Sequence, residues 1–145
     1  MRDNLRLSLH QEIGHKFETF IKDLLTFSFG LDVQDISNWN STFDLLVNGR
    51  CLEVKVAYPT KRIVKNGAKD RWQFNFASKV GVKEAYYAII IAIDDSGNEF
   101  VYCIPGGNIT GPTVQLTSHP NKYTGKYARY LNDFEGLINF IEGDK

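Results

Sequence analysis

Asp44, Glu53 and Lys55 are the residues whose types and spacing best suit chemistry, and they flank the dipeptide Asn48-Gly49. Asn-Gly between two apolar segments is the strongest local signal for a two-residue type I′ hairpin turn. Counting outwards from that turn brings Asp44 directly opposite Glu53 on the same face, and Cβ atoms opposed in this way lie about 4.5–5.5 Å apart. Two like charges this close repel each other, and a divalent cation between them would turn the repulsion into a binding site.

These residue types favour metal-assisted hydrolysis of a phosphodiester. Carboxylate oxygens suit Mg²⁺, which also binds water and substrate phosphate readily. Strand alternation puts Lys55 one step along the same face as Glu53. An amine there can stabilise charge on a phosphoryl group, or position and deprotonate a water. The alternative is an exposed Glu–Lys pair on a solvent-facing strand, opposite an incidental Asp44.

Length and composition set the class of protein. A chain of 145 residues is long enough for one domain with a real core, and we expect a single domain over residues 1–145. No apolar run approaches the roughly 20 residues that span a bilayer, and the first residues lack a signal-peptide core. Cys51 and Cys103 form neither a metal-type pair nor a disulfide framework. We therefore expect a reduced cytoplasmic protein without a membrane segment.

Basic residues are concentrated in one stretch of a chain whose net charge is zero. Residues 50–83 hold nine basic side chains against two acidic ones, a net charge of +7. Such a stretch attracts a polyanion even in a neutral protein, although a solubilising surface is the alternative. The candidate phosphate contacts are Lys61, Arg62, Lys65, Lys69 and Arg71.

Hydrophobic periodicity predicts the elements that must position these residues. We expect a helix over 8–27, a short strand over 31–36, hairpin strands over 42–47 and 50–58, and a long polar loop over 59–70. These are followed by a strand over 71–76, a turn or short helix over 77–84, strands over 86–93, 99–104 and 114–116, and a helix in the second half of 123–141. The apolar face of this last helix is expected to consist of Tyr127, Tyr130, Leu131, Phe134, Leu137, Ile138 and Ile141. One face of the hairpin should be buried: Phe43, Leu45, Val47, Leu52, Val54 and Val56. The order indicates an α/β or α+β domain with a mixed central sheet between an N-terminal and a C-terminal helix.

Phe43-Asp44-Leu45-Leu46 followed by Leu52-Glu53-Val54-Lys55 resembles the signature of the PD-(D/E)xK nuclease superfamily. That superfamily includes many restriction endonucleases, archaeal Holliday-junction resolvases and some homing endonucleases. The resemblance covers roughly residues 10–105, with Phe43 in place of the proline of the motif. It implies a restriction-endonuclease-like core, with Asp44, Glu53 and the Val54 carbonyl as Mg²⁺ ligands. Lys55 would orient the attacking water and stabilise the transition state.

The resemblance adds two candidates outside the hairpin. Many resolvase-like members place a glutamate on the first helix four residues after a small residue, and Gly14 and Glu18 fit that arrangement on one helix face. In some members a glutamine on the next strand touches metal-bound water or DNA, which points to Gln73. A solvated helix glutamate and a surface glutamine are the alternatives. Trp39 and Trp72 could stack on bases, but packing in the core or at its rim is the better interpretation.

The resemblance implies a Mg²⁺-dependent DNA endonuclease of restriction or homing type, with Mn²⁺ able to substitute. Its partners would be double-stranded or branched DNA and further copies of itself, in a homodimer or higher homo-oligomer. A prokaryotic, phage or archaeal cytoplasm fits such an enzyme. The alternatives are a Holliday-junction resolvase, which reads DNA shape, and a non-catalytic DNA-binding module that kept the fold.

Overall fold

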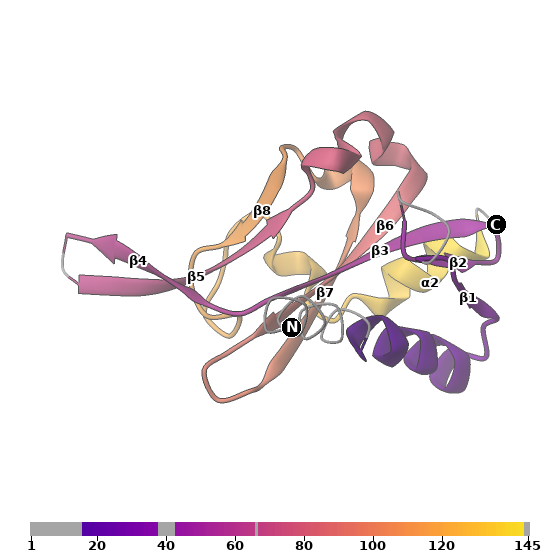
Figure 1. Ribbon diagram of the computed structural model, residues 1–145, viewed down its shortest axis with the longest axis horizontal. Helices are drawn as coiled ribbons and strands as arrows, with labels where there is room; N and C mark the ends of the chain where they lie inside the picture. Colours follow the sequence, from indigo (N-terminus) through magenta and orange to yellow (C-terminus); the bar gives the residue numbers. More distant parts are fainter. Residues whose placement is uncertain (1–15, 38–42, 66, 144–145) are drawn as a thin grey trace, which may run out of the picture.

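A computed structural model describes residues 16–37, 43–65 and 67–143 of the chain. Its strands form two sheets (Figure 1), a five-stranded one in the order β1-β2-β3-β6-β7 and a three-stranded one in the order β4-β5-β8. The strands are β1 (Val33–Asp35), β2 (Leu45–Val47), β3 (Arg50–Ala57), β4 (Thr60–Val64), β5 (Gly67–Asn75), β6 (Tyr86–Ile93), β7 (Glu99–Pro105) and β8 (Thr113–Leu116). The mixed sheet predicted from the sequence is confirmed.

Helical segments precede, interrupt and follow the strands. A first helix covers residues 16–29, and its last turns have π-helical hydrogen bonds over Leu24–Ser28 (η1). Its predicted beginning at residues 8–15 lies outside the described residues. The later segments are η2 (Ala77–Ala85), η3 (Gly106–Asn108), η4 (Ala128–Tyr130) and α2 (Phe134–Glu142). Every helix of the described part is too short or too polar to cross a bilayer.

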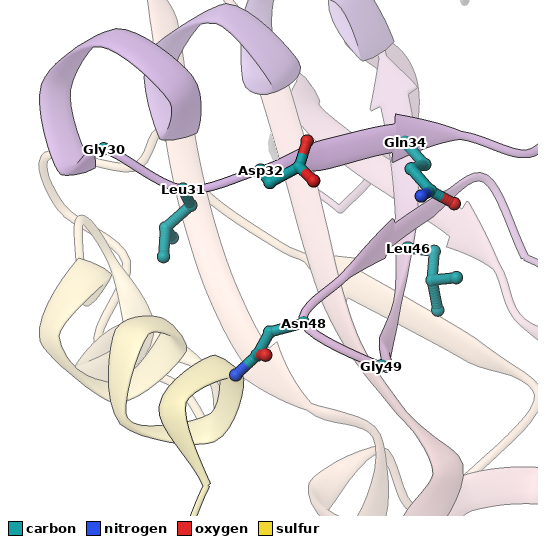
Figure 2. A pocket seen from close by; sticks show the side chains of 7 residues that line it. All are labelled: Gly30, Leu31, Asp32, Gln34, Leu46, Asn48 and Gly49. Carbon is teal, nitrogen blue, oxygen red and sulfur yellow. The ribbon is translucent and has the colours of Figure 1, made fainter.

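The turn at Asn48-Gly49 has the predicted conformation. Its φ angles are 51° and 78°, the two positive values that a type I′ turn requires. Leu45 therefore pairs with Leu52, in the register that counting from the turn predicts. The Asn48 side chain points towards α2 (Figure 2) and donates a hydrogen bond of 3.0 Å to the carbonyl of Ile141. The turn conformation and this hydrogen bond to α2 thus both fix the register that brings Asp44 towards Glu53.

The central strands are buried on both faces. Strand β3 pairs in parallel with β6, whose eight residues are all buried, as is usual for parallel strands covered on both sides. On one face lies the helix-side core, where the first helix and α2 pack on the sheet; it includes Phe17, Ile21, Leu25, Leu45, Val47, Leu52, Val54, Leu137 and Ile141. On the other lies the sheet-side core, which includes Phe43, Trp72, Phe74, Phe76, Tyr86, Tyr102, Val114, Leu116, Tyr127 and Tyr130. Glu53 and Lys55, which alternate with the helix-side residues of β3, therefore face a second hydrophobic layer.

Three expectations from the sequence were wrong in detail. Phe43 packs in the sheet-side core, because β2 begins only at Leu45 and strict alternation stops there. Residues 59–70 are not a loop: β4 pairs with the first half of β5, around a turn whose Gly67 has a φ of 132°. Tyr127 and Tyr130 precede α2 and join the sheet-side core, so the C-terminal apolar residues do not share one helix face.

The two tryptophans were proposed either to stack on bases or to pack in the core. Trp72 is 1% exposed, and its indole Nε1 donates a hydrogen bond of 2.8 Å to the carbonyl of Ile93. Core packing is therefore confirmed for Trp72. Trp39 lies outside the described residues.

We expect Gly49→Ala to lower the free energy of unfolding by about 1–2 kcal/mol, because an L side chain is strained at positive φ. A Cβ at Gly49 meets no atom within 4 Å, so the cost comes from the backbone alone. Gly81→Ala is the matched control, because Gly81 has equal space and no positive φ in the strained range. Urea unfolding measures both variants, and equal stability of the two would contradict the role of the turn.

Candidate active site

Three hydrogen bonds hold Asp44 between strands β1 and β3. Its amide donates to the carbonyl of Leu52 at 3.1 Å, and its carbonyl accepts from the amide of Ile36 at 2.9 Å. Its side-chain Oδ2 accepts from the amide of Val54 at 2.9 Å. The last bond spans ten positions of the chain and points the carboxylate at the middle of β3, beside Glu53.

The Glu53 carboxyl is buried against a like charge and an opposite one. Glu53 is 4% exposed, and its carboxyl lies within hydrogen-bond reach of that of Asp44. The ammonium of Lys79 is 2.8 Å from Glu53 Oε2, an ion pair that lacks the angles of a hydrogen bond. Burial, followed by the hydrogen bond and charge of Asp44, raises the pKa of Glu53 to about 8, and Lys79 opposes the rise.

Glu18 joins this pair from the first helix. Burial is the largest cause that raises the pKa of Glu18 to about 7, and the charges of Asp44 and Asp35 add to it. A hydrogen bond with Asp44 raises this pKa further, whereas one with Ser37 lowers it. Asp35 in turn accepts a 3.0 Å hydrogen bond from the amide of Ser37. The helix therefore brings Glu18 to Asp44, and the three carboxyls of Glu18, Asp44 and Glu53 form a chain.

Two lysines approach the sheet-side face of β3. Lys55 is half-buried, and its Nζ lies 5.9 Å from the centre of the Phe76 ring. Lys79 is fully buried, and its Nζ lies 5.8 Å from the centre of the Phe43 ring. Both ammonium groups thus rest on the aromatic layer of the sheet-side core. It is Lys79, and not the neighbouring Lys55, that forms the ion pair with Glu53.

Lys79 was missed by reasoning from the sequence. It lies in η2, a 3₁₀ segment with a kink at Val82, where no regular periodicity predicts which side chains are buried. A lysine is almost never fully buried unless it is paired. The only signal in the sequence was its place in the basic stretch, shortly after Phe76, and that signal suggests a solvated side chain.

Gln73 is placed away from the carboxyls. It lies on the exposed face of β5, where its Oε1 accepts a 3.4 Å hydrogen bond from Gln115 on β8. Its neighbours Trp72 and Phe74 face the sheet-side core instead. No interaction in the described part of the chain links Gln73 to Asp44 or Glu53.

The predicted phosphate contacts lie on β4, β5 and the turn between them. Lys61 forms ion pairs with Asp70 and, at 3.8 Å, with Asp95. Lys65 and Lys69 are exposed, whereas Nε of Arg71 is buried and has no hydrogen-bond partner among the described residues. The side chain of Arg62 lies outside the described part.

The donor set fits Mg²⁺. Burial and then the neighbouring Asp44 carboxyl raise the pKa of Glu53, and a cation between the two carboxyls would relieve their repulsion. No group of three or more His, Cys, Asp or Glu side chains in the described segments is arranged to hold a metal by itself. Mg²⁺ needs no such cage, because it is usually bound by one or two carboxylates with water and substrate phosphate.

Two hollows of the described surface lie away from these carboxyls. One of about 310 Å³ (Figure 2) opens at the edge formed by β1 and the β2–β3 turn, lined by Gly30, Leu31, Asp32, Gln34, Leu46, Asn48 and Gly49. Another of about 350 Å³ lies beside Lys126 and Arg129. None of the carboxyls of the candidate site lines either of them, so neither of these two hollows is the candidate site.

No protein-family model matches the sequence, and no curated protein matches it either. Among solved structures, a bacterial homing endonuclease, I-Ssp6803I, has a similar fold. The TM-score is 0.54 at 14% sequence identity, and the similarity covers 90% of this chain and 90% of that one. The strands and helices that carry the candidate site therefore belong to a fold like that of a known nuclease.

The stability of the metal-free protein should fall as the pH rises from 4.5 to 8. Across that range the unfolded chain has released the proton of Glu53, whereas the native state retains it, because the native pKa is about 8. The raised pKa of Glu18 acts in the same direction. Thermal unfolding in the presence of a chelator checks this, and Glu53→Gln should flatten the dependence. A melting temperature that increases with pH over the same range would be the contrary result.

At pH 9, above the native pKa of Glu53, Lys79→Met should lower the free energy of unfolding by about 3 kcal/mol, because it leaves the Glu53 carboxylate buried without a cation. This is the lower end for a broken buried pair, since Glu53 can take up a proton. Adding Glu53→Gln to Lys79→Met should recover much of the loss, and the exposed Lys69→Met should change stability by less than about 0.5 kcal/mol. Equal small effects at Lys79 and Lys69 would show that the ion pair contributes little.

Proposed function

We propose that the protein is a Mg²⁺-dependent DNA endonuclease that hydrolyses phosphodiester bonds. The observation that carries the proposal is the buried contact between the Asp44 and Glu53 carboxyls, with two lysines on the same side of the sheet. Packing alone gains nothing from two neighbouring carboxyls, because each is costly to bury. The similar fold of a homing endonuclease supports the same activity.

Asp44 and Glu53 would hold the Mg²⁺, with the Val54 carbonyl as a further ligand and with Mn²⁺ able to substitute. Asp44 is suited to this task because the amide of Val54 fixes its orientation. When bound, the ion supplies a Lewis acid that polarises the phosphate and makes a bound water more acidic. Lys79 pairs with Glu53 and lowers its pKa, so that the carboxylate is easier to form.

Lys55 would act on the substrate. In the hydrolysis, a water oxygen gives up a proton and forms a bond to phosphorus, the bond from phosphorus to the leaving nucleotide oxygen breaks, and that leaving oxygen takes up a proton in turn. Negative charge accumulates on the phosphoryl oxygens, and an ammonium beside them stabilises it. Lys55 is half-buried on the face of Glu53, so it can meet a phosphate while remaining positioned. Glu18 interacts with Asp44 and would help to hold it in place. Gln73 lies away from the carboxyls, so a contact with DNA suits it better than a role beside them.

The substrate is proposed to be double-stranded DNA cut at specific sites, as by restriction and homing enzymes. One chain supplies one such set of residues and a duplex has two strands, so a symmetric homodimer or higher homo-oligomer would act on both. A Holliday-junction resolvase would use the same residues on branched DNA, and the choice of substrate distinguishes the two.

Purified protein should cleave plasmid DNA with Mg²⁺ and not with Ca²⁺. Asp44→Asn and Lys55→Ala should each reduce the cleavage rate by at least about 100-fold, because the first removes a metal ligand and the second removes the ammonium that acts on the reacting phosphate. Glu142→Gln removes an exposed carboxylate from α2 and serves as the matched control. Discrete linear products select a site-specific enzyme, whereas a preference for four-way junctions over every linear sequence selects a resolvase. Full activity of Asp44→Asn and Lys55→Ala, or binding of DNA without any cleavage, would contradict the proposal.

Calorimetry tests whether Glu53 is a ligand of the metal. Glu53→Gln should weaken the binding of Mg²⁺ in calorimetry while leaving the circular dichroism spectrum unchanged, because the amide keeps the shape of the side chain and loses its charge. Glu142→Gln is again the control. An unchanged affinity for Mg²⁺ in Glu53→Gln would remove Glu53 from the set of ligands.

A further inference from the structure

Strand β4 and the first half of β5 form an arm that projects from the body of the protein (Figure 1). We define the arm as residues 60–65 and 67–71, in which Thr60 pairs with Arg71 and Val64 with Gly67. From Trp72 onwards β5 leaves β4 and pairs with β8 instead. A hairpin of two strands is marginally stable in water by itself, so this arm is an unusual element to leave uncovered.

The charge of the arm is strongly positive towards its tip. Residues 60–71 hold five basic side chains and one acidic one, a net charge of +4 in a chain with a net charge of zero. Near the base, Asp70 and Asp95 pair with Lys61. Lys65 and Lys69 are exposed and pair with no carboxylate among the described side chains. The partner that this charge fits is a polyanion.

The arm also presents an apolar side chain between its lysines. Ile63 is 90% exposed, more than any other large hydrophobic residue of the described part. Its cross-strand partner is Ala68, and it shares a strand face with Lys61. An uncovered β-branched residue on an exposed ribbon invites aggregation, which is a reason to expect that its partner covers it.

We propose that the arm enters the major groove of duplex DNA and that Ile63 contacts the methyl groups of thymine. The major groove is about 12 Å wide and admits a two-stranded β-ribbon, and the thymine methyl is the apolar group on its floor. Lys65 and Lys69 would bind the phosphates on either side of the groove. The net charge of the arm favours DNA over a second copy of this chain, because two such arms repel each other.

This inference rests on the proposed function and makes Ile63 a residue that determines the specificity of a sequence-reading nuclease. It also assigns the phosphate contacts to the lysines and the base contact to Ile63. Lysine contacts to phosphate give affinity without sequence information, whereas contacts to base edges give sequence preference. Substitutions of the lysines should therefore lower the affinity for every sequence, whereas a substitution of Ile63 should remove the sequence preference.

The test is selection from a pool of short random-sequence duplexes with Ca²⁺, which holds the complex without cleavage. Wild type should enrich sequences with A·T pairs at fixed positions, and Ile63→Ala should lose that preference while keeping its affinity for the unselected pool. Lys65→Ala and Lys69→Ala should bind more weakly, each with a slope of log K against log salt reduced by about 0.9. Phe27→Ala removes an 82% exposed side chain from the first helix, far from the arm, and should match wild type.

A second measurement isolates the methyl group. The enriched duplex is prepared again with deoxyuridine in place of thymidine, and wild type should bind it about fourfold more weakly for each thymine methyl that Ile63 covers in the original duplex. Ile63→Ala should bind both duplexes equally. The inference is overturned if Ile63→Ala selects the same sequences and distinguishes the duplexes as wild type does. It is also overturned if this variant only converts a dimer into a monomer in sedimentation.

Plasmid cleavage with Mg²⁺ in the same preparations separates the two proposals. If wild type cleaves DNA while Ile63→Ala, Lys65→Ala and Lys69→Ala leave selection and salt dependence unchanged, the assignment of the arm fails and the nuclease proposal stands. If wild type neither binds nor cleaves any of these DNAs, both fail. Cleavage by Ile63→Ala at more sites than wild type, with an unchanged rate per site, supports both.

Discussion

The contact between the carboxyl groups of Asp44 and Glu53 is the interaction on which the rest of the site depends. It exists because the β2–β3 turn fixes their register and the Val54 amide holds the Asp44 carboxylate in place. Burial makes the contact costly, as the pKa of about 8 at Glu53 indicates. Lys79 offsets part of that cost, because η2 places its ammonium beside Glu53 on β3.

The two carboxyls that we propose for catalysis are not the side chains that would make the fold most stable. A pair of neutral side chains at positions 44 and 53 would fill the same space without repulsion, as buried ion pairs replaced by apolar residues often do. Sites that keep perturbed carboxyls at such a cost are more often functional than structural. A functional role also explains why Glu53 faces a hydrophobic layer, since an apolar surround strengthens any interaction with a cation or a phosphate.

The two sheets have different roles in the function that we propose for the protein. The five-stranded sheet and its helices hold the carboxyl cluster rigidly between two cores. The three-stranded sheet shares β5 between a buried part, which pairs with β8, and the projecting arm. One strand, β5, runs through both parts, and the hydrogen bond from Trp72 to the carbonyl of Ile93 connects it to β6 of the five-stranded sheet. In the proposed enzyme, this connection would keep the cut at a fixed distance from the recognised sequence.

The sequence by itself determined the features whose causes are local. Asn48-Gly49 specified the turn and therefore the register, strict alternation identified β3, and an apolar run identified β6, because each follows from neighbouring residues. Only the tertiary structure decided that Lys79 pairs with Glu53, that Phe43 lies in the sheet-side core, and that β4 and the first half of β5 form a projecting arm. These depend on contacts between segments far apart in the chain or on irregular backbone, and periodicity carries no information about either. The carboxyl pair could thus be counted from the sequence, whereas its buried cation could not.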